Sequence, residues 1–260
     1  MFSMKRSALK YYGGKWKMAP KIIKMFPAHK VYVEPFGGGG SILLRKDRSY
    51  NEVYNDIDSS VVRYFRVLRD FPNMLISKIL LTPYSREEFE FCISDNDTED
   101  EIELARRYFI RSWMSIMGAN KNKKPRNSDF SYHIKRSNTN CIPKESDLYA
   151  IVDRLTDFMI EHLDFEDCIH RYDSEETLFY VDPPYYGKCG DAYQNNISEE
   201  DHIRLSKTLK TIKGFACISG TQSDFYDRLY SYWKTIEFPA INAMNVIKTE
   251  KLWMNYEFDV

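Results

Sequence analysis

The feature that most constrains the fold is a run of four glycines, Gly37–Gly40, directly after the short β-prone segment Val31–Phe36. A strand that breaks into glycines before Ser41–Leu44 predicts a strand, a tight loop and the start of a helix. A second short strand is predicted over Glu52–Asp58, and apolar residues at helical spacing follow over 61–68. This alternation predicts an α/β fold with a mostly parallel, doubly wound sheet.

The alternation is interrupted in the middle of the chain. Between about residues 70 and 160 the pattern is helical, as in Leu104–Met117, and it runs into a polar, basic stretch from 118 to 140. We therefore predict that residues 70–160 form an inserted, mainly helical module.

Strand and helix signals resume after this insertion. An apolar strand is predicted at Leu178–Val181, a helix near 199–209 and another strand at 215–219. Residues 1–69 and 161–260 are accordingly predicted to form one α/β domain that is split in the sequence.

Composition indicates an ordinary water-soluble chain. Its 260 residues, 43% hydrophobic and 29% charged, are enough to bury a sizeable core. We find no stretch of membrane-spanning length and no apolar signal segment at the start. The five cysteines are odd in number and widely spaced, which indicates neither a disulfide framework nor a zinc site. We expect a cytoplasmic protein without membrane association or bound metal.

Charge is distributed unevenly, although the net charge is only -1. Residues 1–30 and 105–136 are strongly basic, whereas residues 87–103 are crowded with acids. This segregation predicts one basic face and one acidic face; the alternative is two solvated helix surfaces that differ in sign. A basic face would suit a nucleic-acid partner.

Two features indicate a nucleotide-like ligand. Glycines after a strand let the backbone approach a ligand closely, but Gly37–Gly40 lacks the P-loop ending and does not fit Gly-x-Gly-x-x-Gly. By itself it would suit phosphate, a dinucleotide or adenosylmethionine. Asp56 lies roughly twenty residues further on at the end of a predicted strand, where a carboxylate can accept both ribose hydroxyls. An NAD enzyme would have the same arrangement.

The tetrapeptide Asp182-Pro183-Pro184-Tyr185 directly follows the apolar strand at 178–181. It brings an anionic acceptor, a carbonyl of fixed direction and a flat ring to one point, which predicts a site for a planar amine. The alternative is a strand followed by an ordinary Pro-Pro turn.

Together, and in this order, the motifs resemble those of the Dam-type (D12 class, alpha group) adenine-N6 DNA methyltransferases, in a phage-like version. The segment Tyr11-x-x-x-Lys15 resembles the one that precedes the family's glycine loop, and Glu34–Gly39 resembles its S-adenosyl-L-methionine loop. Asn55-Asp56-Ile57 resembles the family's ribose-binding acid with its apolar neighbour. Asp182–Tyr185 resembles its Asp-Pro-Pro-Tyr signature.

Two further segments resemble the family less closely. Phe165 lies in a stretch similar to one that lines the cofactor's adenine. Residues 249–256 resemble a terminal segment common in phage-type relatives, which we expect to form an edge strand beside the substrate pocket. For Trp253 and Tyr256 in this segment, a packing role is at least as well supported.

The resemblance implies a Rossmann-like methyltransferase fold with a mixed, mostly parallel seven-stranded sheet. It implies S-adenosyl-L-methionine as cofactor, S-adenosyl-L-homocysteine as product, and no metal. The implied cofactor-binding residues are Tyr11, Lys15, Glu34, Pro35, Phe36, Gly37, Gly38, Gly39, Asp56, Ile57, Phe165 and Asp182.

The implied catalytic residues are Asp182, Pro183, Pro184 and Tyr185. Asp182 and the Pro183 carbonyl would accept hydrogen bonds from both hydrogens of adenine N6, while Tyr185 stacks on the base. Transfer of the methyl group would be direct, and the adenine would have to be flipped out of double-stranded DNA.

The inserted module would contact the DNA. The candidate phosphate- or base-contacting residues are Arg107, Arg111, Lys121, Lys123, Lys124, Arg126, Lys135 and Arg136. We expect a site-specific adenine DNA methyltransferase, monomeric or weakly dimeric, in a bacterial or phage-infected cytoplasm; a cognate restriction nuclease is not inferable. The alternatives are a cytosine-N4 or RNA amino-methyltransferase, or a catalytically silent DNA-binding regulator.

Overall fold

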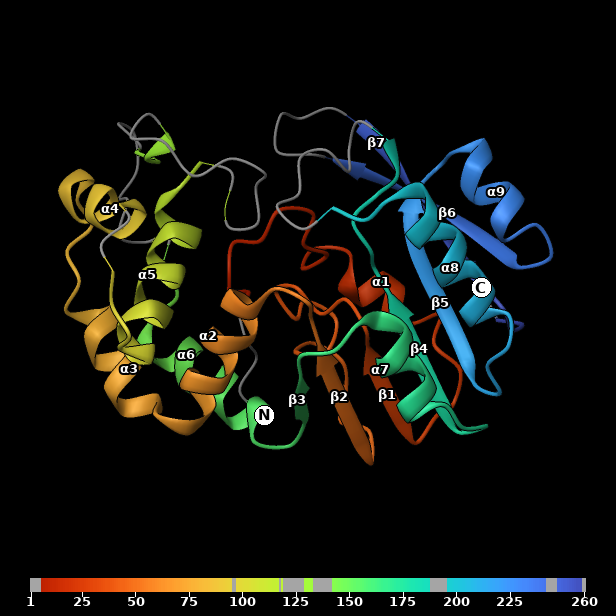
Figure 1. Cartoon of the computed structure of the whole chain (residues 1–260), viewed down its shortest axis with the longest axis horizontal. Coiled ribbons are helices and arrows are strands. Elements are labelled where there is room, and N and C mark those ends of the chain that lie inside the picture. Colours follow the sequence, from red (N-terminus) through yellow and green to blue (C-terminus); the bar gives the residue numbers. More distant parts are fainter. Residues whose placement is uncertain are drawn as a thin grey trace.

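A seven-stranded sheet forms the centre of the computed structural model (Figure 1). The structure describes residues 6–94, 97–116, 118, 129–132, 142–187, 196–241 and 247–258. The strands are β1 (Val31–Glu34), β2 (Asn51–Asn55), β3 (Met159–Glu161), β4 (Thr177–Val181), β5 (Phe215–Thr221), β6 (Lys234–Ile241) and β7 (Ile247–Met254). Their order across the sheet is β3-β2-β1-β4-β5-β7-β6.

Successive strands are added to one side of β1 as far as β3, and β4 then begins the other side of the sheet. β1 pairs in parallel with β2, Val33 facing Val53, and with β4, Val33 facing Phe179. β7 alone runs antiparallel to its neighbours β5 and β6. The carboxyl ends of β1 and β4 thus flank a topological switch point, where doubly wound sheets place their ligands. This confirms the predicted mixed, mostly parallel α/β fold.

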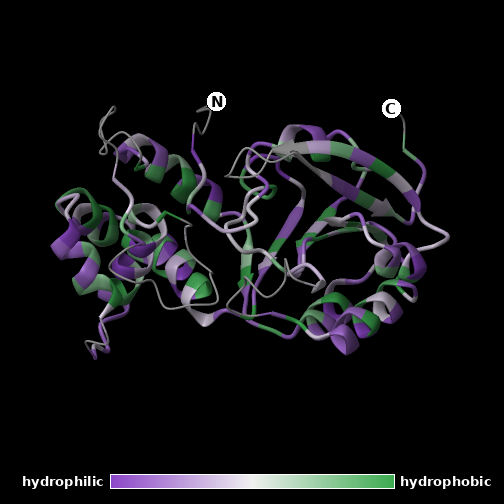
Figure 2. Ribbon diagram, turned by 90° about the horizontal axis from the view of Figure 1, so that it is seen from above, coloured by the Kyte–Doolittle hydropathy of each residue, from purple (hydrophilic) through white to green (hydrophobic). Residues whose placement is uncertain are grey.

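Each face of the sheet has its own hydrophobic core because side chains alternate along the strands. Along β4, Leu178 and Tyr180 point to one face, and Phe179 and Val181 point to the other; all are buried. The second face is covered by α7 (Phe165–Tyr172), α8 (Glu199–Leu209) and α9 (Asp224–Leu229). Figure 2 shows hydrophobic and hydrophilic residues mixed along the helices that cover the sheet, as expected when one side of a helix is buried and the other is exposed.

The first face is covered by α1 (Ala19–Ile23) and α2 (Ser59–Asp70), and its core continues into a group of helices beyond β3 (Figure 1). These are α3 (Pro72–Leu80), α4 (Arg86–Ile93), α5 (Glu101–Met114) and α6 (Glu145–Leu155). The Tyr64 ring on α2 stacks on Phe109 of α5, with centroids 6.0 Å apart. The helical group therefore shares a core with the sheet.

Two local predictions were wrong. Residues 41–44 form successive turns instead of starting a helix. The backbone N–H of Leu43 donates to the Glu34 carboxylate and its carbonyl accepts from Arg154, so side chains hold the backbone polar groups that a helix would pair. The C-terminal strand β7 is not at the edge, because β6 pairs with it on the outer side.

Among the described residues, no helix is both long and apolar enough to cross a membrane.

Candidate functional site

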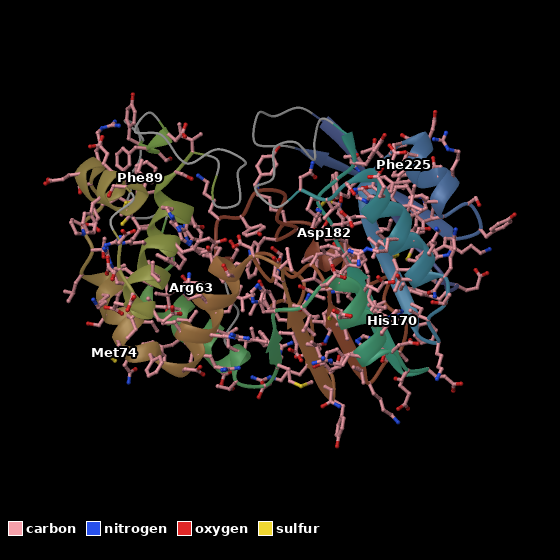
Figure 3. The ribbon with its side chains drawn as sticks, in the orientation of Figure 1. Arg63, Met74, Phe89, His170, Asp182 and Phe225 are labelled. Atoms are coloured by element: carbon pink, nitrogen blue, oxygen red, sulfur yellow. The ribbon has the colours of Figure 1, made fainter. Side chains whose placement is uncertain are left out.

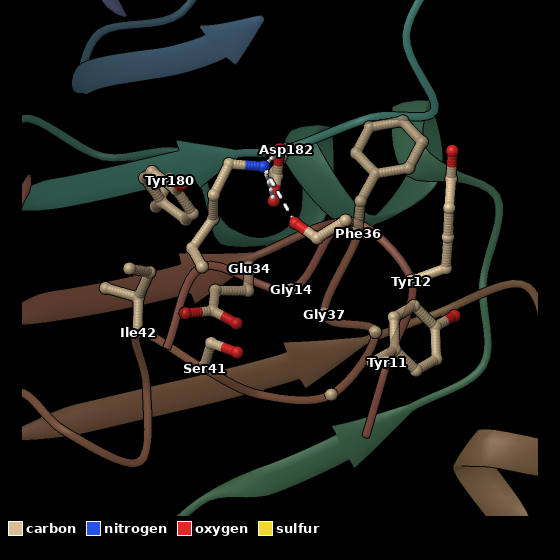
Figure 4. A pocket seen from close by; sticks show the side chains of 14 residues that line it. Tyr11, Tyr12, Gly14, Glu34, Phe36, Gly37, Ser41, Ile42, Tyr180 and Asp182 are labelled. Carbon is tan, nitrogen blue, oxygen red and sulfur yellow. Dashed lines mark hydrogen bonds and ion pairs between the residues drawn. The ribbon is translucent and has the colours of Figure 1, made fainter. Parts of the chain in front are cut away.

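A pocket lies at the switch point, between the carboxyl ends of β1 and β4 (Figure 4). It lies between the glycine loop, Gly37–Gly40, and the acceptor loop, Asp182–Tyr185. Near the middle of the molecule, Asp182 lies between the labelled Arg63 and Phe225 (Figure 3). The pocket is lined by Tyr11, Tyr12, Gly13, Gly14, Lys15, Glu34, Phe36, Gly37, Gly38, Gly39, Ser41, Ile42, Tyr180 and Asp182.

Lys15 joins the N-terminal segment to the acceptor loop. Its Nζ lies 2.8 Å from Asp182 Oδ1 and 2.9 Å from Oδ2, across 167 residues of sequence. It also donates to the Gly13 carbonyl at 3.0 Å and lies 4.8 Å from the centre of the Tyr185 ring. With only 6% of the Lys15 side chain exposed, this ion pair is largely withdrawn from solvent screening.

The glycine loop is shaped by two tyrosines of the protein itself. A Cβ on Gly37 would lie 2.2 Å from the Tyr54 ring, and one on Gly38 would lie 2.8 Å from the Tyr11 ring. Gly38 also has a φ of 48°, in the left-handed region that favours glycine. The Tyr54 hydroxyl donates to the Gly38 carbonyl at 2.7 Å. Close packing of the Tyr54 and Tyr11 rings therefore requires glycine at positions 37 and 38, whether or not a ligand also requires it.

Glu34, at the end of β1, anchors the far side of this loop. Its Oε1 accepts from the Tyr32 hydroxyl and from the Leu43 N–H, each at 2.8 Å. Burial raises the pKa of Glu34 to about 8, and the two hydrogen bonds only partly oppose that shift. Pro35, which follows, accepts a hydrogen bond on its carbonyl from the Asn55 amide at 2.9 Å.

Asp56 is also tied to the glycine loop. Its Oδ2 accepts from the Gly38 N–H at 2.8 Å, and its Oδ1 accepts from the Asp58 N–H at 2.9 Å. Burial raises the pKa of Asp56 to about 6. Asp56 is not among the residues that line the pocket, and one further lone pair on each oxygen remains for another donor.

The apolar residues expected around the cofactor's adenine lie in different environments. The Phe36 and Phe165 rings stack with centroids 5.4 Å apart, and the Arg204 guanidinium lies 4.1 Å from the centre of Phe165. Ile57, by contrast, is 54% exposed. Phe36 and Phe165 thus form one apolar wall, and Ile57 lies at the surface.

Three residues that sequence reasoning missed as site residues surround the acceptor loop. Ser219 on β5 donates to Asp182 Oδ1 at 2.7 Å, and Tyr180 on β4 donates to Ser219 at 3.1 Å. Glu250 on β7 accepts from the Tyr185 hydroxyl. For Ser219 the signal was available, since a polar residue at the carboxyl end of a parallel strand lies at the ligand edge of the sheet.

The predicted DNA-contacting residues are only partly described. Lys121, Lys123, Lys124, Arg126, Lys135 and Arg136 lie outside the described residues. Arg107 is buried, with its Nε 2.9 Å from Glu103 and its guanidinium over Phe91, which fits packing better than phosphate contact. Arg111 is half-buried beside Tyr108.

The prediction of separate acidic and basic faces was wrong for the start of α5. Arg106 pairs with Glu88 at 2.6 Å and with Glu103 at 2.7 Å, so these opposite charges neutralise each other within the helical group. Over the described part of the chain, no group of three or more His, Cys, Asp or Glu is arranged to hold a metal ion.

Comparison with known proteins places this chain in a family. The model of the D12 class N6 adenine-specific DNA methyltransferase family matches residues 11–246. The chain is 25% identical to the Type II methyltransferase M.CviBI of Paramecium bursaria Chlorella virus NC1A over 235 residues, covering 88% of each. It is 25% identical to the Type II methyltransferase M.MjaIII of Methanocaldococcus jannaschii, covering 91% of this chain and 92% of that protein.

A third relative is the DNA adenine methylase of Salmonella typhi, 26% identical over 192 residues, which cover 69% of this chain and 65% of that protein. Because the family model spans nearly all of the chain, from Tyr11 past the acceptor loop, this protein belongs to the D12 class N6 adenine-specific DNA methyltransferases.

Proposed function

We propose that this DNA adenine methyltransferase transfers a methyl group from S-adenosyl-L-methionine to N6 of an adenine flipped out of double-stranded DNA. The observation that carries the proposal is the meeting of the acceptor loop with the glycine loop, where Lys15 holds Asp182 at 2.8 Å beside the pocket. A site for an amine and a site for a nucleoside cofactor thus share one cavity.

The residues around this pocket fit S-adenosyl-L-methionine. Its lining combines aromatic rings, the backbone of Gly37–Gly39 and the carboxyl groups of Glu34 and Asp182. Aromatic rings suit an adenine, and a carboxylate such as that of Asp182 suits a sulfonium or an ammonium group. The spare lone pairs of Asp56 would accept ribose hydroxyls. When bound, the cofactor supplies an electrophilic methyl group.

Asp182 would accept one hydrogen of the adenine amino group, and the Pro183 carbonyl would accept the other. Both would direct the nitrogen lone pair toward the methyl group and stabilise the positive charge that develops on N6. Asp182 Oδ1 already accepts from Ser219 and Lys15, so the amine must share the carboxylate with them. Tyr185, fixed at its hydroxyl, would present its ring to the base.

We propose that residues 70–160 contact the DNA, with Arg111 and the six basic residues between 121 and 136 as candidates. Arg107 is left out because it is buried against Glu103 and Phe91. Phosphate contacts of this kind are electrostatic, so affinity for duplex DNA should fall steeply with salt. The protein would work in the cytoplasm as a monomer or weak dimer.

The test is transfer of a labelled methyl group to duplex DNA by wild-type protein and by Asp182→Ala. Asp227→Ala is a matched control, because Asp227 also pairs with a lysine, Lys251 at 2.7 Å, but does not line the pocket. We expect Asp182→Ala to abolish transfer of the label to DNA and Asp227→Ala to retain it. Undiminished transfer by that variant would refute the role of Asp182, and DNA binding without transfer by wild type would favour a silent regulator.

A further inference from the structure

Glu250, on β7, lies beside the acceptor loop with its carboxylate almost enclosed. Only 10% of the side chain is exposed, and its backbone pairs with Thr221 at the end of β5. Burial raises the pKa of Glu250, and Lys15 and Tyr185 oppose that shift. A carboxylate is costly to bury without partners, so the identity of its partners indicates what it does.

Tyr185 and Lys15, the two side chains that contact the Glu250 carboxylate in the described part of the chain, belong to the acceptor site. The Tyr185 hydroxyl donates to Glu250 Oε1, and Lys15 Nζ lies 3.5 Å from the same oxygen. The same two groups also face Asp182: Lys15 Nζ is 2.8 Å from Asp182 Oδ1, and the Tyr185 hydroxyl is 3.3 Å from it. Glu250 and Asp182 thus share two donors.

This sharing affects how many hydrogen-bond acceptor positions of the Asp182 carboxylate are available to a substrate amine. A carboxylate has about four acceptor positions, and Ser219 already occupies one on Oδ1. If Glu250 were absent, the Tyr185 hydroxyl could turn to Asp182 Oδ1, which lies 3.3 Å away. That bond would fill a position on Asp182 that an incoming amine needs.

We propose that Glu250 is a positioning residue for methyl transfer. It draws the Tyr185 hydroxyl toward itself, which keeps a position on Asp182 Oδ1 open to the substrate amine and fixes the Tyr185 ring, while Lys15 stays paired with Asp182. The inference rests on the proposed function, because it assigns Glu250 a part in presenting the acceptor amine at the same site.

Two substitutions separate the two contacts. Glu250→Gln keeps an oxygen that can accept from Tyr185 but loses the charge that attracts Lys15, and Glu250→Ala loses both. Glu237→Gln on β6 is the matched control, since this glutamate is 47% exposed and pairs with Lys251 at 3.8 Å. Thermal unfolding of each variant checks that it is folded.

We expect substitution of Glu250 to lower the rate of methyl transfer and to leave cofactor binding nearly unchanged. Glu250→Ala should lower the single-turnover rate on duplex DNA about 10- to 100-fold, and Glu250→Gln should recover part of that loss. KM for S-adenosyl-L-methionine should change about threefold or less, because the effect falls on the acceptor. Glu237→Gln should match wild type. A Glu250→Ala rate within about twofold of wild type, in a folded variant, would overturn the proposal.

A double-mutant cycle tests the pairing itself. Tyr185→Phe should slow transfer less in the Glu250→Ala background than in wild type, because Glu250→Ala has already removed the acceptor of the Tyr185 hydroxyl. Equal effects in both backgrounds would overturn the inference. If wild-type protein transfers no methyl group to DNA, the proposed function fails; the same cycle on urea midpoints then tests the pairing, and additive midpoint shifts would overturn it.

Discussion

Replacing Gly37 with alanine should destabilise the protein through the Tyr54 ring. The new Cβ would lie 2.2 Å from Tyr54 Cε2, so the ring would have to move by about 1 Å to reach ordinary contact at 3.4 Å. Such movement would break the hydrogen bond from the Tyr54 hydroxyl to Gly38. Overpacking costs about 1–3 kcal/mol and the lost bond about 0.5–1.5 kcal/mol, so we expect the free energy of unfolding to fall by about 2–4 kcal/mol.

Urea denaturation of Gly37→Ala measures this loss. Gly40→Ala is the matched control: its φ is 63° but a Cβ there would meet nothing closer than 3.4 Å, so only the left-handed backbone cost of about 1–2 kcal/mol applies. In a Tyr54→Leu background, Gly37→Ala should cost less than in wild type. Normal stability with lost affinity for S-adenosyl-L-homocysteine would refute the reasoning, because the glycine would then serve the ligand alone.

Three further predictions concern buried charge. The pKa of Glu34 is raised to about 8, so the folded state holds a proton that the unfolded state loses, and stability should fall as pH rises from about 4.5 to 8; thermal melts of Glu34→Gln should lack this decline. Burial lowers the pKa of His202 to about 4, so acidification from about pH 6.5 to 4 should destabilise wild type, and His202→Phe should lose that dependence. Arg154→Leu removes a partner of the buried Glu52 and should cost about 3–5 kcal/mol in urea, whereas loss of the exposed Arg48 pair should cost at most about 1 kcal/mol.

The strands that carry the site could be predicted from sequence because their signals are local. The apolar run at 178–181 became β4, fully buried and paired with β1 and β5. The order of the strands could not be obtained from local patterns, and the antiparallel position of β7 depends on pairing with β5 and β6. The expected edge strand was therefore wrong.

Long-range contacts also explain what sequence reasoning missed at the site. The helix expected at Ser41–Leu44 is replaced by turns, because Glu34 and Arg154 bind the backbone of Leu43 from distant positions. The approach of Glu250 to Tyr185 spans 65 residues and leaves no local signal. Arg107 looks like a phosphate ligand by composition alone, and only the fold places it against Glu103.

Sequence motifs did anticipate which segments meet. Lys15, the glycine loop and Asp182 converge on one pocket, although no periodicity links them. Their convergence follows from topology, since β1 and β4 are neighbours whose carboxyl ends point the same way. A motif order shared with a family therefore carried information that local propensity did not.

The most direct test of the central claim is the identity of the methylated nucleoside. Duplex DNA is incubated with wild-type protein and S-adenosyl-L-methionine labelled in its methyl group, digested to nucleosides and separated by mass. We expect label in N6-methyl-2′-deoxyadenosine only, and no label with Asp182→Ala. Label in N4-methyl-2′-deoxycytidine, or no label in DNA with folded protein, would contradict the proposed function.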